Sequence, residues 1–429
     1  MNNKKVELLS PAGNLEKLKI AIKYGADAVY AGVSHFSLRI RAGKEFTFET
    51  FKEGIDYAHA RGKKVYATIN GFPFNSQIEL LKKHIATMAA LEPDGFIVAA
   101  PGVVKLCREI APQIDIHLST QANVLNYLDA QVFWDMGVKR IVVAREISLK
   151  DVIEIKKHLP DMEIEIFVHG SMCFAYSGRC LVSAVQMGRV PNRGSCANDC
   201  RFEYTLYAAN EDHSTLFRLE EEPGVGTYIF NSKDMNLASH IKEILDSGAV
   251  DSLKIEGRTK SPYYAAVTAK AYRNAIDDYY DGKFEASKYQ RELYTTKNRG
   301  FTDAYLIHRP FEKTDSQNHD YALSKGSYEV TGLVTQDEEH FLCKYKVYPN
   351  EDIEIFTPMG EELVECENEI GKIFKKDGIY YINFKKILTE TNKELESVHS
   401  GNVNKIKLPG KLPYLTMFRI ENIDGTIVE

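Results

Sequence analysis

Short apolar runs alternate with amphipathic stretches through residues 5–260 of the chain. The runs, among them KVELLS, DAVYAGV and EIEIFVHG, have the length and residue types of buried strands. Between them, apolar residues recur at helical spacing, as Leu15, Leu18 and Ile22 do in the stretch NLEKLKIAIKYG. Asn14 can cap this helix and Gly25 can end it. The pattern therefore predicts strands that alternate with helices.

The number and order of these units predict a closed barrel. About eight or nine strand–helix units fit into about 280 residues, and short connections between them imply parallel strands with right-handed crossovers. This repetition favours an α/β fold of the (β/α)8 type, a TIM-like barrel, over an open doubly wound sheet, which is the alternative. Neither a dinucleotide fingerprint nor a Walker-type loop follows the first strand. We assign residues 1–283 to the barrel, with a cysteine-rich insertion at 165–201.

The pattern changes after residue 283. Residues 284–327 are polar and rich in turn residues, and we predict that they form a connecting wrap. Short β-like runs follow, such as YEVTGLV and GIYYINF, so residues 328–429 are predicted to form a small C-terminal β-barrel domain. Its lysines indicate either a solvated surface or an RNA-contacting face. They are Lys372, Lys375, Lys376, Lys385, Lys386, Lys405, Lys407 and Lys411.

Composition narrows the class of protein. Hydrophobic residues make up 44% of the 429 residues and charged residues 27%, as in ordinary soluble globular proteins. The formal net charge of −6 argues against a strongly basic nucleic-acid binder, although it is compatible with a local basic face. The first residues lack an apolar signal core, and no run of about 18 apolar residues occurs. We therefore expect a cytoplasmic protein without a membrane segment, in which thiols stay reduced.

Four of the seven cysteines fall within residues 165–201. Cys173, Cys180, Cys196 and Cys200 are separated by glycine- and serine-rich sequence that lets a backbone wrap closely around a small inorganic group. Structural zinc usually takes two tight pairs of ligands, and only Cys196 and Cys200 form such a pair. Disulfides need an oxidising compartment. An iron–sulfur cluster tolerates irregular spacing and is the favoured interpretation, with zinc and unliganded or disulfide-bonded cysteines as alternatives.

Polar residues follow the predicted strands where each strand ends, which is where the active site of a (β/α)8 barrel lies. Each alone has an ordinary structural explanation, such as a local ion pair or a helix cap. Together they predict one cation-rich pocket suited to a polycarboxylate or a phosphate. The candidates are Arg39, Asn70, Gln121, Arg145, Glu146, His169, Lys233, Asp234, Lys254, Glu256 and Arg258.

The stretch EIFVHGSMCFAYSGRCLVS resembles the signature of the collagenase-like peptidases, family thirty-two of the peptidases of unknown catalytic type. The resemblance extends to ELLSPAGNLEKLKIAIKYGADAVYAG, STQANVLN, SCANDCR and LKIEGRTKSPYY, and so covers nearly the whole chain. The length of the chain is similar to that of the subgroup of tRNA hydroxylation proteins.

The resemblance implies a tRNA hydroxylase that forms 5-hydroxyuridine at the wobble position. It implies a [4Fe–4S] cluster on the four cysteines, prephenate or a derivative as co-substrate, and a partner protein of the same family. In the predicted pocket, arginines would hold the carboxylates of the co-substrate while Asn70 and Gln121 orient it. Lys254 and either Glu256 or His169 would carry the catalytic chemistry.

A peptidase and a non-catalytic RNA- or protein-binding scaffold remain alternative interpretations. The sequence has neither the H-E-x-x-H pattern of a zinc protease nor the G-x-S-x-G elbow of a serine hydrolase. Ser171 lies in GSMC without the second glycine. A nucleophile–base pair of Cys173 with His169 is conceivable, but it would take one ligand from the cluster.

Overall fold

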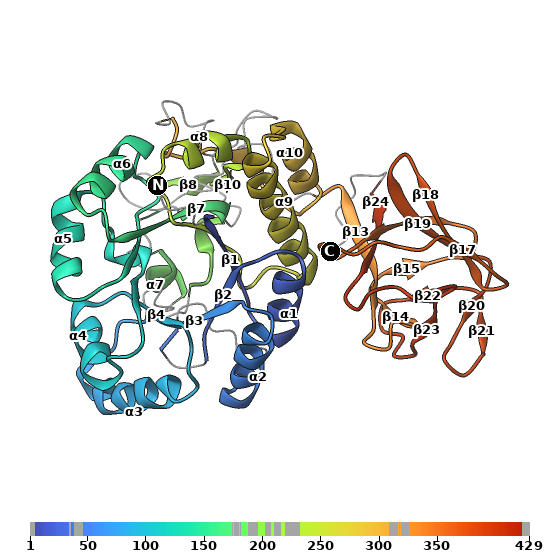
Figure 1. Cartoon of the computed structure of the whole chain (residues 1–429), viewed down its shortest axis with the longest axis horizontal. Helices are drawn as coiled ribbons and strands as arrows, with labels where there is room; N and C mark the ends of the chain where they lie inside the picture. The colour runs from blue at the N-terminus through green and yellow to red at the C-terminus, as the bar shows by residue number, and fades with distance from the viewer. Residues whose placement is uncertain are drawn as a thin grey trace.

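The structure, a computed structural model, describes residues 5–33, 36–37, 46–173, 175, 180, 182–187, 196–201, 207–209, 216–218, 232–308, 316, 318 and 326–422. Figure 1 shows a barrel ringed by helices, with an antiparallel sheet beside helix α9 (Pro262–Tyr280). Each part has its own apolar core. Within the described residues, no helix has the length and apolar character needed to cross a membrane.

Eight parallel strands form the barrel in the order β11-β1-β2-β3-β4-β5-β6-β7. Because β11 pairs with both β1 and β7, the ring is closed, which confirms the predicted TIM-like barrel and excludes the open sheet. The strands are β1 (Glu7–Pro11), β2 (Ala28–Ala31), β3 (Lys64–Ile69), β4 (Gly95–Val98), β5 (Ile116–Leu118), β6 (Arg140–Val142), β7 (Glu163–Ser171) and β11 (Ser252–Ile255).

Helices cover the outside of the barrel because each has one apolar face. In the first, the Asn14 side chain accepts from the Lys17 backbone N–H, as predicted, and Gly25 follows its end with a φ of 109°. The other outer helices follow the strands in the same way. The helices are α1 (Leu15–Lys23), α2 (Phe48–His59), α3 (Ile78–Ala89), α4 (Pro101–Ile110), α5 (Tyr127–Asp135), α6 (Leu149–His158) and α8 (Ile241–Asp246), with short 3-10 turns η1 (Asn75–Gln77), η2 (Thr120–Ala122) and η5 (Ala238–His240).

Two short strands extend the barrel sheet outside the ring. β10 (Asp234–Asn236) runs antiparallel to β7, and β12 (Phe301–Thr302) pairs with β10. The helix α10 (Ala286–Tyr294) packs on α9. The segment that the sequence indicated as a connecting wrap, residues 284–327, therefore also adds a helix and a strand to the barrel part. Within the cysteine-rich insertion and beyond it lie α7 (Val182–Met187), η4 (Asp199–Arg201), β8 (Tyr207–Ala209) and β9 (Leu216–Arg218).

The C-terminal part is an antiparallel sheet of eight strands around a core that contains Phe341, Phe384 and Phe418. Its order is β17-β18-β19-β16-β24-β13-β14-β23, which confirms the predicted second, all-β domain. The strands are β13 (Tyr328–Val334), β14 (His340–Cys343), β16 (Asp352–Phe356), β17 (Cys366–Glu367), β18 (Gly371–Lys376), β19 (Ile379–Phe384), β23 (Ile406–Lys407) and β24 (Met417–Glu421), with the small pairs β15 (Lys346–Val347) and β22 (Val398–His399), and β20 (Ile387–Leu388) and β21 (Glu394–Leu395).

Buried polar contacts attach this sheet to the barrel. Arg419 of β24 forms ion pairs with Glu292 of α10 and with Glu354 of β16. The hydroxyl of Tyr24, at the end of α1, donates to the backbone carbonyl of Phe356 at 2.9 Å, and the two rings stack with centroids 5.3 Å apart. Since the Arg419 side chain is buried, these contacts fix the orientation of the sheet against α1, α9 and α10.

Candidate functional site

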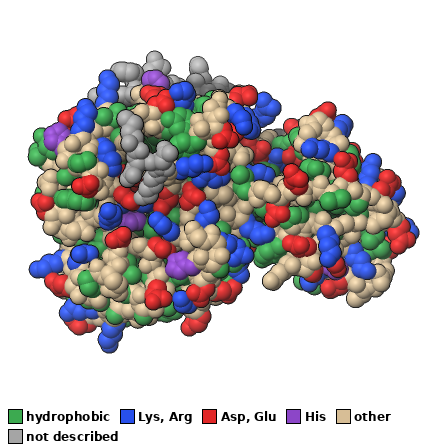
Figure 2. All heavy atoms as spheres, viewed as in Figure 1, with side chains coloured by type: hydrophobic (Ala, Val, Ile, Leu, Met, Phe, Trp, Pro, Cys, Tyr) green, Lys and Arg blue, Asp and Glu red, His purple; other side chains and the backbone are tan. Residues whose placement is uncertain are grey.

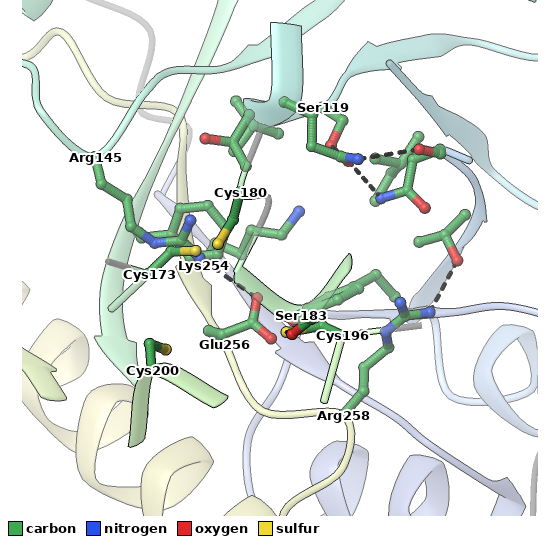
Figure 3. A pocket seen from close by; sticks show the side chains of 18 of the residues that line it. Ser119, Arg145, Cys173, Cys180, Ser183, Cys196, Cys200, Lys254, Glu256 and Arg258 are labelled. Atoms are coloured by element: carbon green, nitrogen blue, oxygen red, sulfur yellow. Dashed lines mark hydrogen bonds and ion pairs between the residues drawn. The ribbon is translucent and has the colours of Figure 1, made fainter. Parts of the chain in front are cut away.

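A cavity of about 120 Å³ lies at the C-terminal ends of the barrel strands. Its wall combines the ends of β3, β5, β6, β7 and β11 with residues of the cysteine-rich insertion. Figure 3 shows the labelled side chains arranged around Glu256. The structure thus brings ten of the predicted site residues together: Asn70, Gln121, Arg145, Cys173, Cys180, Cys196, Cys200, Lys254, Glu256 and Arg258.

All four predicted metal-binding cysteines line this cavity, although they come from separate segments. Each is a free thiol, so the disulfide alternative is wrong for this structure. The Oγ of Ser183 in α7 lies 3.9 Å from the Sγ of Cys196 and accepts from the Ala197 backbone N–H at 3.1 Å. Among the described residues, no three His, Cys, Asp or Glu side chains are grouped closely enough for a single metal ion. The donor set is four thiols spread around one cavity.

A buried ion pair forms the floor of the cavity. The Nζ of Lys254 lies 2.7 Å from an Oε of Glu165, and both side chains point into the barrel. Burial lowers the pKa of Lys254 below its ordinary value, against the opposing effect of Glu165. Burial alone would raise the pKa of Glu165, but Lys254 and Arg140 together hold that pKa below its ordinary value. The Lys254 nitrogen thus lies at the floor of the cavity with the Glu165 carboxylate directly beside it.

Below this ion pair, further charged side chains form a network inside the barrel. They take the place of the apolar side chains that usually fill the interior of a (β/α)8 barrel. Arg140 lies 3.0 Å from Glu165, 2.6 Å from Glu7 and 2.7 Å from Glu163. The hydroxyl of Tyr66 donates to Glu7 at 2.8 Å. Glu165 and Arg140 were not among the residues predicted for the site. The alternation in EIEIF was the available signal, because residues two apart on a strand point to the same side.

Two arginines line the wall and each has partners inside the protein. The guanidinium of Arg145 lies 3.8 Å from the ring centroid of Phe167, and its Nη2 is 3.5 Å from Glu256. Arg258 donates to the hydroxyl of Ser37 at 2.7 Å and to that of Thr68 at 3.0 Å. These contacts hold both guanidinium groups in place at the cavity before any ligand binds.

Amide and hydroxyl groups order the opposite side. Gln121 accepts from Asn70 at 2.9 Å and from Ser119 at 2.6 Å, and it donates back to the Asn70 carbonyl at 3.1 Å. All three side chains are buried. Because these three hydrogen bonds of Gln121 are made within one buried cluster, the amides of Asn70 and Gln121 have defined orientations, as the orienting role predicted for them requires.

Four predicted residues are not brought to the cavity. Glu146, His169, Lys233 and Asp234 are absent from the described residues that line it, and Arg39 lies outside the described residues. Asp234 instead forms a buried ion pair with Arg299. The expectation that every strand end faces one mouth fails for Lys233 and Asp234, because β10 runs antiparallel to β7.

His169 is buried behind the cavity wall, with its Nδ1 3.4 Å from the hydroxyl of Tyr272. Burial lowers its pKa to about 3, so the folded protein holds it neutral. The unfolded chain takes up this proton below about pH 6.5. Stability therefore falls as the pH drops from about 6.5 towards 3, by up to about 1.4 kcal/mol per pH unit for this group.

We expect the His169→Gln variant to lose less stability than the wild type between pH 6.5 and pH 5. Urea unfolding at several pH values measures the slope. The exposed His399→Asn substitution is the control and should leave the slope unchanged. A His169→Gln slope equal to that of the wild type would contradict a neutral, buried imidazole.

Comparison with known proteins identifies the family of this chain. The model of Peptidase family U32 matches residues 13–316. The chain belongs to peptidase family U32. This confirms the family that the cysteine motif predicted.

Several proteins similar to this U32 chain carry names connected with RNA. The "tRNA hydroxylation protein P" of Helicobacter pylori is 64% identical over 416 residues, which are 97% of this chain and 99% of that protein. The protein of the same name from Escherichia coli is 39% identical and covers 86% of this chain and 90% of its own length. A 23S rRNA 5-hydroxycytidine synthase of Escherichia coli is 33% identical over 277 residues, 65% of this chain and 40% of that enzyme.

Proposed function

We propose that this protein is an RNA hydroxylase that converts the wobble uridine of tRNA to 5-hydroxyuridine. The observation that carries the proposal is the convergence of four cysteines and three cationic side chains, Arg145, Lys254 and Arg258, on one cavity. The names of three of the similar proteins support RNA as the substrate class. The structural-scaffold alternative gives no reason for burying three cations around four thiols.

The thiols fit an iron–sulfur cluster in the nature and number of their donor atoms. Four cysteine thiolates are the usual ligand set of a [4Fe–4S] cluster, and here they surround a single cavity. Cys173, Cys180, Cys196 and Cys200 would hold it. When bound, such a cluster supplies electron transfer. Anaerobic purification with iron and sulfide analysis tests this assignment, and stoichiometric zinc in a colourless protein would contradict it.

The cationic wall suits a co-substrate with carboxylates, such as prephenate or a derivative. The Nη2 of Arg145 lies 3.5 Å from an oxygen of Glu256. This contact is longer than the hydrogen bonds that a bidentate carboxylate makes with a guanidinium group. Lys254 adds positive charge from the floor. Converting the C5–H of uridine to C5–OH is a two-electron oxidation of the base. The reaction therefore needs a donor of the oxygen atom and an acceptor of the C5 hydrogen and two electrons. We assign both parts to the bound co-substrate, which would give up one hydroxyl group and take one hydrogen in its place.

Glu256 is the proton-transfer group of this proposal. It lines the cavity beside Arg145, whereas His169 lies outside the lining and stays neutral. The peptidase alternative requires a base next to a cysteine nucleophile. No histidine is present among the described residues that line the cavity, so the pair of Cys173 with His169 is not formed there.

Arg145→Ala and Arg258→Ala should each abolish wobble hydroxylation while leaving iron content and cluster absorbance unchanged. Losing one bidentate arginine–carboxylate contact costs roughly 2–4 kcal/mol, about 30- to 1,000-fold in affinity for the co-substrate. Mass spectrometry of tRNA nucleosides from a deletion strain carrying each variant measures the product. Arg108→Ala, on the outer helix α4, is the control and should restore the modification. Wild-type levels of 5-hydroxyuridine in both cavity variants would show that the site is elsewhere.

A further inference from the structure

A second cavity, of about 390 Å³, lies where the barrel meets the C-terminal sheet. Figure 2 shows a notch between these two parts of the molecule. The barrel side is formed by α1 and the end of α2, and the sheet side by the turn between β13 and β14 and by the approach to β24. We call this cavity the junction groove. Its lining includes Lys19, Lys23, Tyr57, Arg61, Glu338 and Tyr414.

Cations and aromatic rings are interleaved in the junction groove. The guanidinium of Arg61 lies 3.7 Å from the ring centroid of Tyr57, and the Nζ of Lys19 lies 5.5 Å from the same centroid. The Nζ of Lys23 lies 5.7 Å from the ring centroid of Tyr414. Flat rings and guanidinium planes offer stacking surfaces for bases, while the positive charges attract phosphates. A site that binds a single nucleic-acid strand uses both the stacking surfaces and the positive charges.

One polar group in the groove lacks a protein partner. The hydroxyl oxygen of Tyr57 is buried and makes no hydrogen bond within the part of the chain that the structure describes. A buried hydroxyl without a partner is costly, and a ligand oxygen within reach would remove that cost. A phosphate oxygen held by Lys19, Lys23 or Arg61 would be such an acceptor.

The acidic groups around the groove do not prevent anion binding. Lys19 pairs with Glu53 at 2.7 Å and Lys23 with Glu361 at 3.9 Å, and both carboxylates are more than a third exposed. Exposed pairs of this kind contribute only about 0–1 kcal/mol, so a phosphate can replace the carboxylate. The Glu338 carboxylate accepts from the Tyr414 backbone N–H at 3.1 Å and so helps to position that ring.

Helix α1 connects the groove with the first cavity. Lys17, in its first turn, donates to the backbone carbonyl of Arg258 at 3.4 Å, whereas Lys23 is its last residue. The helix has nine residues. At a rise of 1.5 Å per residue the helix is roughly 13 Å long.

We propose that the junction groove binds the RNA substrate, holding its phosphates on Lys19, Lys23 and Arg61 and a base against the tyrosine rings. This assignment rests on the proposed function, because it takes RNA as the substrate. It gives the C-terminal sheet a role in the site, since Tyr414 and Glu338 come from that part.

The test compares tRNA binding by the full-length, anaerobically purified protein with binding by the Lys23→Ala/Arg61→Ala double variant. Fluorescence anisotropy at salt concentrations from about 50 to 200 mM gives Kd and its salt dependence. We expect Kd to rise about tenfold at the lower salt concentration. The slope of log Kd against log salt should become shallower by about 1.4–1.8, the value for two lost phosphate contacts. Tyr57→Phe should weaken binding by a smaller factor.

Lys82→Ala is the matched control, because Lys82 is exposed on α3 and pairs with Glu79 at 2.7 Å, as Lys19 does with Glu53. It should bind tRNA as the wild type does. If the double variant has the Kd and slope of this control, the groove assignment is wrong. A double variant that binds weakly while the deletion strain keeps its 5-hydroxyuridine would support the groove and overturn the proposed reaction. A wild-type protein that does not bind tRNA overturns both.

Discussion

Cys173→Ala should yield a protein with background levels of iron and sulfide and no detectable wobble hydroxylation. Cys173 lies two residues after the end of β7 and lines the cavity together with the other three cysteines. Three remaining thiolates cannot complete a four-cysteine ligand set, and a cluster bound there would hold together the segments that supply its ligands. Iron and sulfide analysis, visible absorbance and tRNA nucleoside mass spectrometry measure the three expected losses.

Cys107→Ala is the matched control for this substitution. Cys107 is buried in α4 and away from the cavity, and burial raises the pKa of its thiol to about 12, so it is not available as a thiolate ligand. This variant should keep its iron and its activity. An iron content unchanged by Cys173→Ala, or lost equally in Cys107→Ala, would contradict the assigned ligand set.

Glu165→Ala should destabilise the protein by about 3–5 kcal/mol, because it leaves Lys254 and Arg140 as buried positive charges without their shared partner. Chemical denaturation at pH 7 measures the loss. The double variant Glu165→Leu/Lys254→Met removes both charges of the pair and should recover much of the stability. It should remain inactive, since the cavity has then lost its floor cation.

The Glu165 carboxylate should also make the free energy of unfolding decrease at acidic pH. The pKa of Glu165 is held below its ordinary value, so its stabilising contribution is complete above the unfolded-state pKa of about 4.3 and is lost as the pH falls further. In the Glu165→Gln variant, the free energy of unfolding should depend less on pH below about pH 4.3. If Glu165→Ala and the double variant were equally stable, the ion pair would not be the source of the loss.

The barrel and the cysteine site could be predicted from the sequence because both depend on patterns of nearby residues. Strand and helix periods, short connections and the spacing of Cys173 to Cys200 are all visible within a few dozen residues. The positions at strand ends predicted four further residues of the site, because a parallel barrel brings these ends to one side. They are Asn70, Gln121, Arg145 and Glu256.

The incorrect predictions have a common physical cause. Each concerns a feature that depends on contacts between segments far apart in the sequence. The antiparallel direction of β10 is set by pairing with β7 and β12, so nothing near Asp234 reveals it. His169 ends against Tyr272, more than a hundred residues away. The Glu7–Arg140 contact exists only because the ring closes. Ring closure and strand direction are properties of the whole fold and leave no signature at single positions.

The Arg419 ion pairs bear on how an RNA ligand would experience the two cavities. They fix the sheet, and with it one wall of the junction groove, against the barrel that carries the first cavity. Two sites on one rigid body need no linker ordering when both are filled. For an RNA that reaches both, docking at one site raises its effective concentration at the other. Under the proposed RNA binding, Arg419 would keep the distance between the two sites constant, and its loss would let more than one nucleotide reach the first cavity.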